Sequence, residues 1–156
     1  MRVMDSVEGC LACDLAAGRI DLPGGRVHET AHWIVEHCVG PLGVGTLLVK
    51  PKRHVVSVGE LTPAEANEMG PLLQRAAAIV DELVAPEQVY VGLWSHAGRT
   101  RVHVHYVVQP ATTEAIDAAG TYGPNLQSAM FAAGVMPAPD EVGVFSDRAR
   151  AAFTRT

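Results

Sequence analysis

The chain has 156 residues and 48% of them are apolar, which is typical of one folded domain with a substantial core. Its formal charge of −5 excludes the broad positive surface that holds a nucleic-acid polymer. No apolar run approaches the roughly 18 residues of a membrane span, and Asp5 stands where a signal peptide keeps its apolar segment. We therefore expect a single cytoplasmic domain over residues 1–156, with a small molecule as its partner and no role for nucleic acid or membrane.

Three cysteines, Cys10, Cys13 and Cys38, lie near the start of the chain. They are too few and too clustered for the disulfide framework of a secreted domain. The C-x-x-C spacing of Cys10 and Cys13, in a reducing compartment, instead favours a metal site or a redox pair.

Two sheet-forming segments follow the cysteines. Residues 27–36 mix alternation with the apolar run Trp-Ile-Val, which predicts a β-hairpin with its turn near residues 29–32. After a glycine-rich break, residues 46–50 form a short apolar run that stops at Pro51, because proline lacks the N–H that strand pairing needs. This second run is predicted to be a buried strand.

The clearest helix of the sequence begins after Thr62. The stretch Thr-Pro-Ala-Glu at residues 62–65 combines a hydroxyl N-cap, a proline at the first helical position and a glutamate that closes a capping box. Apolar residues then recur at three- and four-residue steps to about Val84, which gives the helix one apolar stripe to lay on a sheet.

The second half of the chain predicts a hairpin followed by helices. Residues 89–94 and 101–110 have strand patterns and are joined by a glycine-containing loop, so we expect them to pair antiparallel. Three helical segments are predicted after them: 112–119, 125–133 and 140–153. Strands, one long central helix and helical pieces at the end fit an α+β domain whose antiparallel sheet is covered on one face.

Two histidines stand one residue apart in RVHVHYVVQP, residues 101–110. Because side chains alternate across a strand, His103 and His105 are predicted to share one side, with Cα atoms about 7 Å apart. Both rings can then act on one ligand. Structural strand histidines, or a histidine pair that shares a Zn²⁺ or Fe²⁺ ion, are alternatives that this pattern leaves open.

A second block, GTLLVKPKRH at residues 45–54, places His54 just after a Pro-Lys-Arg turn. Together with the C-x-x-C, the capped helix and the spaced histidines before a Gln-Pro pair, this block resembles the histidine triad family of nucleotidyl hydrolases and transferases. The resemblance covers about residues 10–110. It implies a HIT-like α+β fold, in which one long central helix packs on an antiparallel sheet, and residues 111–156 form a C-terminal helical extension outside it.

The resemblance implies a chemistry for the two histidines. His103 would be the nucleophile that attacks the α-phosphorus of a nucleotide, with the backbone carbonyl of residue 101 setting its tautomer. His105 would donate to a phosphoryl or bridging oxygen. Ser95 and Thr100 are candidate hydroxyl donors to the same phosphate, and ordinary loop polarity is the competing interpretation. The implied reaction passes through a covalent nucleotidyl-histidine and requires no cofactor for catalysis.

The same resemblance implies a structural zinc site, but Arg101 interrupts its ligand set. Cys10, Cys13 and His54 would supply three ligands, and the first position of the triad would supply the fourth. That position is Arg101, whose guanidinium stays protonated and cannot coordinate a cation. Whether zinc binds therefore stays open.

Several groups could complete the zinc site, among them a water, Cys38, His96 or another histidine. Without zinc, the cysteines would be buried thiols, and His54, a candidate substrate-binding residue, would orient the active-site strand. Arg101 would then either pair with a phosphate oxygen of the substrate through its planar fork or reach solvent.

The leading hypothesis is a nucleotidyl hydrolase or transferase that acts on a dinucleoside polyphosphate or a nucleoside phosphoramidate. The alternative is a nucleotide-binding or regulatory module in which the altered triad has lost useful catalysis. The strands that carry Ile34, Val35 and Leu47 would wall the base and ribose, and apolar walls predict loose base selectivity. Members of this family commonly pair as homodimers, and the strand at residues 89–94 offers an apolar edge for such pairing.

Overall fold

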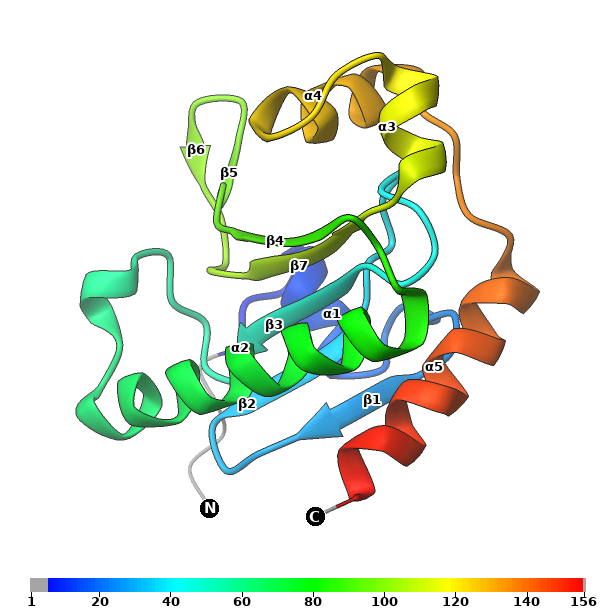
Figure 1. Cartoon of the computed structure of the whole chain (residues 1–156). Helices are drawn as coiled ribbons and strands as arrows, with labels where there is room; N and C mark the ends of the chain where they lie inside the picture. The colour runs from blue at the N-terminus through cyan, green and yellow to red at the C-terminus, as the bar shows by residue number, and fades with distance from the viewer. Residues whose placement is uncertain (1–5, 156) are drawn as a thin grey trace.

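The structure, a computed structural model, describes residues 6–155 (Figure 1). Its centre is a five-stranded antiparallel sheet with the spatial order β1-β2-β3-β7-β4. The strands are β1 (Arg26–Glu29), β2 (Trp33–His37), β3 (Leu47–Pro51), β4 (Gln88–Gly92) and β7 (Tyr106–Ala111). A separate hairpin of β5 (His96–Ala97) and β6 (Thr100–Arg101) projects from the sheet between β4 and β7 (Figure 1). The hairpin predicted over residues 27–36 is confirmed as β1 and β2, and the strand predicted over residues 46–50 is confirmed as β3.

Helices lie on both faces of this sheet. The long helix α2 (Pro63–Val84) and α5 (Pro139–Thr154) lie on one face, whereas the short helix α1 (Leu11–Ala16) lies behind the sheet (Figure 1). The remaining helices are the one-turn η1 (Val58–Glu60), α3 (Thr113–Ala119) and α4 (Pro124–Ala133). The α+β fold is confirmed, but the sheet is covered on two faces rather than one. No helix within residues 6–155 is long and apolar enough to cross a membrane.

Residues 1–5 lie outside the described part of the chain. The expected absence of a signal peptide depends on Asp5 and therefore stays a prediction.

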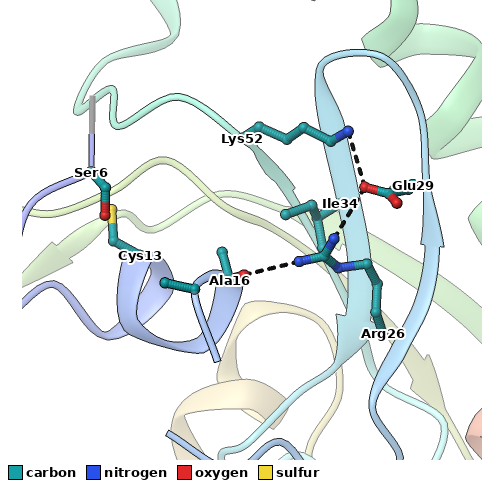
Figure 2. Close-up of a pocket in the computed structure, with 8 residues that line it drawn as sticks. Ser6, Cys13, Ala16, Arg26, Glu29, Ile34 and Lys52 are labelled. Carbon is teal, nitrogen blue, oxygen red and sulfur yellow. Dashed lines mark hydrogen bonds and ion pairs between the residues drawn. The ribbon is translucent and has the colours of Figure 1, made fainter. Parts of the chain in front are cut away.

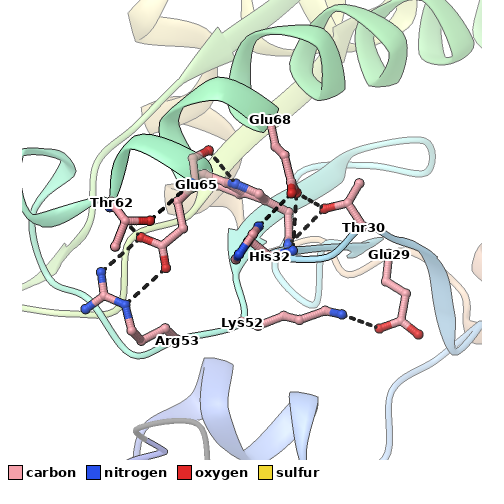
Figure 3. Close-up of polar contacts among 9 residues, drawn as sticks. Glu29, Thr30, His32, Lys52, Arg53, Thr62, Glu65 and Glu68 are labelled. Carbon is pink, nitrogen blue, oxygen red and sulfur yellow. Dashed lines mark hydrogen bonds and ion pairs between the residues drawn. The ribbon is translucent and has the colours of Figure 1, made fainter. Parts of the chain in front are cut away.

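Helix α2 begins and ends where the sequence predicts. Thr62 Oγ1 accepts the N–H of Glu65 at 3.2 Å, and a carboxylate oxygen of Glu65 accepts the N–H of Thr62 at 2.8 Å, so the capping box is complete. Arg53 donates two further hydrogen bonds to the same carboxylate, at 3.0 and 2.9 Å (Figure 3). The start of α2 is therefore tied to the segment that leaves β3.

Replacing Glu65 by glutamine is expected to lower the free energy of unfolding by about 2 kcal/mol at neutral pH, because charge-assisted bonds to Arg53 are weakened. The Arg53 hydrogen bonds hold the pKa of the Glu65 carboxyl below its ordinary value. A carboxyl with a lowered folded pKa contributes stability above its unfolded pKa and loses it as the pH falls through the folded pKa. Denaturant titrations of both proteins from about pH 7 to about pH 3 should show the difference shrinking; a constant difference contradicts this assignment.

The β1–β2 turn is also tied to α2, through Glu68. His32 Nδ1 lies 2.6 Å from one carboxylate oxygen of Glu68, and Thr30 Oγ1 donates to the other at 2.5 Å (Figure 3). The backbone N–H of His32 donates to that second oxygen at 3.2 Å. Hairpin and helix therefore form one unit.

The two faces of the sheet carry different side chains. The face toward α2 and α5 forms the main core, which includes Trp33, Val35, Leu47, Val49 and Val108. On the opposite face, the register pairs Glu36 with Leu48 and Leu48 with Val107, so these three residues form a row across β2, β3 and β7. Leu48 and Val107 pack in a smaller cluster, whose other members are Cys38, Leu42 and Met130.

Helix α5 completes the main core instead of standing apart from it. Phe145, Ala149 and Phe153 are buried there. The close approach of α5 to the chain before β1 requires a glycine at Gly24, because a Cβ at this position would lie 2.2 Å from Ser146 Oγ. The predicted helical segments of the C-terminal extension are confirmed as α3, α4 and α5.

The segment that carries both histidines departs from the predicted strand. β7 begins only at Tyr106, and residues 102–105 belong to neither sheet. Instead of pairing with a strand, Val102 donates its N–H to the carbonyl of Ser95 at 3.1 Å, and His105 donates its N–H to Ser95 Oγ at 3.1 Å. The alternation of a regular strand does not govern this segment, so the two imidazoles need not share a side.

Candidate functional site

Four metal-ligating side chains from distant parts of the sequence meet beside the end of β3. The ligand atoms of Cys10, Cys13, His54 and His103 all lie within 4.8 Å of one another. Nδ1 of His103 lies 3.8 Å from Cys10 Sγ and 3.5 Å from Cys13 Sγ, and Nδ1 of His54 lies 3.4 Å from Cys13 Sγ. Cys10, Cys13 and His54 are the three ligands that the resemblance implies. The fourth member, His103, is the residue for which the resemblance implies the role of nucleophile.

Hydrogen bonds from β3 hold two sides of this cluster. Nε2 of His103 donates to the carbonyl oxygen of Pro51 at 2.8 Å. Nζ of Lys50 donates at 3.0 Å to the carbonyl oxygen of Ala12, which lies between the two cysteines. The end of β3 therefore positions both the C-x-x-C segment and the histidine segment.

The cluster fits a tetrahedral zinc ion. Zn–S bonds of about 2.3 Å and Zn–N bonds of about 2.0 Å place neighbouring ligand atoms roughly 3.4–3.8 Å apart, and the sulfur–nitrogen separations are 3.4, 3.5 and 3.8 Å. The bond to Pro51 places the His103 proton on Nε2, which leaves Nδ1 free to coordinate a metal. Burial lowers the pKa of His103 to about 4 and raises the pKa of the Cys13 thiol. The histidine is thus a neutral donor, and a cation would favour the thiolate form of the cysteine.

His103 is closed to a substrate. Its side chain is 2% exposed, and both ring nitrogens face protein atoms, Nδ1 the cysteine sulfurs and Nε2 the carbonyl of Pro51. A nucleophile needs a free lone pair that an incoming phosphorus can reach. The geometry therefore gives no support to the nucleophilic role that the resemblance implies for this ring.

His105 has the features that His103 lacks. Its side chain is only half-buried, and Nδ1 donates to the carbonyl oxygen of His103 at 2.9 Å. Because a carbonyl only accepts, the ring proton sits on Nδ1, and the Nε2 lone pair has no hydrogen-bond partner within residues 6–155. The resemblance implies a bond of the same kind, in which the nucleophilic ring donates to the backbone carbonyl two residues earlier. It implies this bond for His103 and residue 101, whereas the structure has it for His105 and His103.

The other predicted site residues lie on the β5–β6 hairpin or away from the site. Ser95, at the base of the hairpin, holds the backbone of His105. Thr100 and Arg101 are exposed on β6, and neither belongs to the four-ligand cluster. Arg101 is instead the strand partner of His96 in the hairpin. Cys38 is buried in the smaller hydrophobic cluster. The fourth member of the ligand set is thus another histidine, His103, one of the alternatives that the sequence leaves open.

Sequence reasoning missed a buried ion pair beside the cluster. Lys50 of β3 and Glu36 of β2 are each 1% exposed and form a salt bridge. The sequence does contain a sign of this pair, since Lys50 stands inside the apolar run TLLVKP and Glu36 inside WIVEH. A charged side chain inside a buried strand needs a buried partner of opposite charge.

Two cavities open near α1. One, of about 260 Å³, is lined by Cys13 and by charged side chains from β1 and the end of β3 (Figure 2). In it, Arg26 Nη1 and Lys52 Nζ both bind Glu29, at 3.1 and 3.0 Å. The other, of about 390 Å³, is lined by Glu36 and by residues of α1 and the loop after it. His105 lines neither cavity.

Known proteins resemble this chain in sequence and in structure, although no protein-family model matches it. The adenosine 5′-monophosphoramidase of Schizosaccharomyces pombe is 28% identical over 105 residues, which is 65% of this chain and 74% of that protein. The chain is also similar to a HIT-like protein involved in cell-cycle regulation from Bartonella henselae, with a TM-score of 0.69 and 17% identity over 94% of this chain and 98% of that one.

A further structural relative carries a metal. The zinc-bound histidine triad family protein from Mycobacterium smegmatis has a TM-score of 0.65 and 21% identity, and the match covers 92% of each chain. The resemblance carried by the sequence motifs is thus confirmed, because this chain has the fold of the histidine triad proteins over nearly its whole length.

Proposed function

We propose that the protein is a nucleotidyl hydrolase or transferase that cleaves at the α-phosphorus of a nucleoside monophosphate derivative, with His105 as its nucleophile. The histidine triad fold and the similarity to an adenosine 5′-monophosphoramidase support nucleotide hydrolysis in general. The observation that carries the assignment is the His105 ring, whose Nδ1 is bound to the carbonyl of His103 while Nε2 is left with a free lone pair.

The reaction proceeds in two displacements. Nε2 of His105 attacks the α-phosphorus, an N–P bond forms, and the bond from phosphorus to the oxygen or nitrogen of the leaving group breaks. The leaving group departs with that electron pair and takes up a proton from solvent. Water then attacks the phosphorus, the N–P bond breaks, and the nucleoside monophosphate is released; in a transferase, a second acceptor takes the place of water.

His103 has a supporting role in this proposal. Its backbone carbonyl fixes the tautomer of His105, and its side chain completes a zinc site with Cys10, Cys13 and His54. Zinc held there would cross-link the N-terminal segment to the histidine segment, and it would require no contact with substrate. No catalytic cofactor is needed.

The β5–β6 hairpin supplies the phosphate contacts in this proposal. Ser95 Oγ accepts the N–H of His105 and keeps its own proton for a phosphoryl oxygen. Thr100 and Arg101 are exposed on β6 and are available to the same phosphate.

Trapping of the intermediate tests this function. The protein is mixed with an adenylyl substrate, quenched without acid and digested, and the peptide that contains residues 102–110 is examined by mass spectrometry. We expect a nucleotidyl adduct on His105, because a phosphoramidate survives neutral conditions. An adduct on His103, or turnover without any adduct on a histidine, would contradict the assignment.

A nucleotide-binding module with weak or no catalysis is the second candidate. It is favoured by Val107, a buried apolar residue two positions after His105, where the alternation of histidines would place one more ring. In that case nucleotide would raise the melting temperature, but no monophosphate would be released from adenylyl or guanylyl substrates.

We also propose that the protein is a cytoplasmic homodimer paired through β4. This strand is an edge of the five-stranded sheet, and Val91 and Trp94 beside that edge are 47% and 62% exposed. Three free cysteines suit a reducing compartment. Sedimentation of a 16.5 kDa species at every concentration would contradict the dimer.

A further inference from the structure

The larger cavity combines an apolar wall with three charged side chains, those of Asp21, Arg26 and Glu36. It lies between α1, the loop after α1 and β2, and its volume is about 390 Å³. Its apolar wall consists of Leu15, Ala16, Ile20 and Leu22. Glu36 lines the same cavity although it is 1% exposed. A few fixed polar groups in an apolar wall are what give a small-molecule cavity its specificity.

The two carboxylate oxygens of Glu36 have different surroundings. Oε1 is held by the buried ammonium of Lys50, which also donates to Ala12 O at 3.0 Å. Oε2 has no hydrogen-bond partner within residues 6–155. This oxygen is not completely enclosed by protein atoms, because the completely buried side-chain polar atoms without a partner in the described residues do not include it. The carboxylate is therefore oriented by Lys50 and keeps one acceptor for a ligand in the cavity.

The register of the sheet relates this cavity to the reactive ring. Glu36 pairs with Leu48, and Leu48 pairs with Val107, two residues after His105. Two strand spacings amount to about 10 Å. His105 lies two residues before Val107, which adds about 7 Å along the chain and makes the backbone separation of Glu36 and His105 roughly 12 Å. A nucleoside monophosphate whose base lies beside β2 can reach toward the histidine across this distance, because both side chains extend from the backbone toward it.

We propose that this cavity holds the nucleobase of the substrate and that Glu36 selects a base with an exocyclic amino group, by accepting a hydrogen bond from that group on Oε2. This inference rests on the proposed function and deepens it. It differs from the loose selectivity that apolar walls predict, because a buried acceptor accommodates an N–H and rejects a carbonyl oxygen at the same place.

A matched pair of substrates isolates this contact. Adenosine and inosine 5′-phosphoramidates differ in that a 6-amino donor is replaced by a 6-oxo acceptor. In the unmodified protein, kcat/KM is expected to favour the adenosine compound by about tenfold or more. In Glu36→Gln the amide can keep its oxygen on Lys50 and turn its NH₂ toward the cavity, so the preference is expected to disappear or reverse.

Glu141→Gln is the matched control, because it makes the same chemical change at an exposed carboxylate on α5 that lines neither cavity. It should leave the ratio unchanged. Since Glu36→Gln leaves Lys50 without a full counter-charge and can destabilise the fold, a second variant, Glu36→Leu with Lys50→Met, removes both charges together. In this double variant the ratio is expected to fall to near unity.

The inference is overturned if the unmodified protein does not distinguish the two bases, if Glu36→Gln leaves the ratio unchanged, or if Glu141→Gln moves it equally. Should the protein turn over neither compound, calorimetry reports the same ratio as dissociation constants for adenosine and inosine monophosphates. Turnover that survives in a His105→Ala variant would contradict the assignment of His105 as nucleophile, but the base preference could still be measured. Failure of the proposed function and failure of this inference are therefore distinguishable.

Discussion

His105→Ala is expected to lower kcat for monophosphate release by about 10⁴-fold or more, because this substitution removes the nitrogen that forms the covalent bond. The melting temperature should change little, since the ring is half-buried and its one hydrogen bond is to the carbonyl of His103. The dissociation constant for a nucleoside monophosphate should also change little. Steady-state kinetics, thermal melts and calorimetry on the same preparation check the three expectations.

His96→Ala is the matched control for this variant. It removes an imidazole from the exposed β5–β6 hairpin close in sequence to His105, and it should retain turnover. His103→Ala is expected to lose bound metal and thermal stability as well as activity. If His105→Ala keeps substantial turnover while His103→Ala is folded, metal-loaded and inactive, the nucleophile would be His103, as the sequence resemblance implies.

Cys13→Ser is expected to lower the melting temperature by about 10 °C or more, since the folding energy supplied by a structural zinc site is lost with one of its ligands. Elemental analysis of protein purified without added metal should find about one zinc per chain before the substitution and much less after it. A chelator should lower the melting temperature of the unmodified protein toward that of the variant.

The chain offers a matched control for the cysteine variant. Cys38 is also buried, but it lies in the smaller hydrophobic cluster, where its Sγ accepts the N–H of Gly40 at 3.3 Å. A serine there keeps an acceptor for this bond, so Cys38→Ser should retain zinc and most of the melting temperature. Equal losses in the two variants, or unmodified protein without metal, would contradict the zinc site.

Local patterns in the sequence predicted most elements of the fold. The capping box at Thr62 and Glu65 predicted the first residue of α2, because the two side chains satisfy backbone groups within one turn. The antiparallel pairing of β4 with β7 also followed from local strand patterns, although the connection between the two strands contains the β5–β6 hairpin. These features depend on neighbours within a few residues, which a sequence displays directly.

The different surroundings of the two histidines could not be predicted in this way. Strand alternation placed both rings on one side, but residues 102–105 bind Ser95 and other non-strand partners, and the two rings turn to different surroundings. His103 contacts cysteines 90 and 93 residues away in the sequence. The resemblance implies Arg101 at the fourth ligand position, whereas His103 is the fourth member of the cluster.

The sequence alone determined that this chain folds as an α+β domain with a capped central helix, and it singled out two cysteines and a few histidines as candidates for its site. Only the tertiary structure decided which histidine joins the cysteines, which one keeps a free nitrogen, and that Lys50 and Glu36 are buried as a pair. The physical reason is that coordination, burial and the tautomer of a ring depend on atoms brought together across the sheet, whereas helix caps and strand patterns depend on chain neighbours.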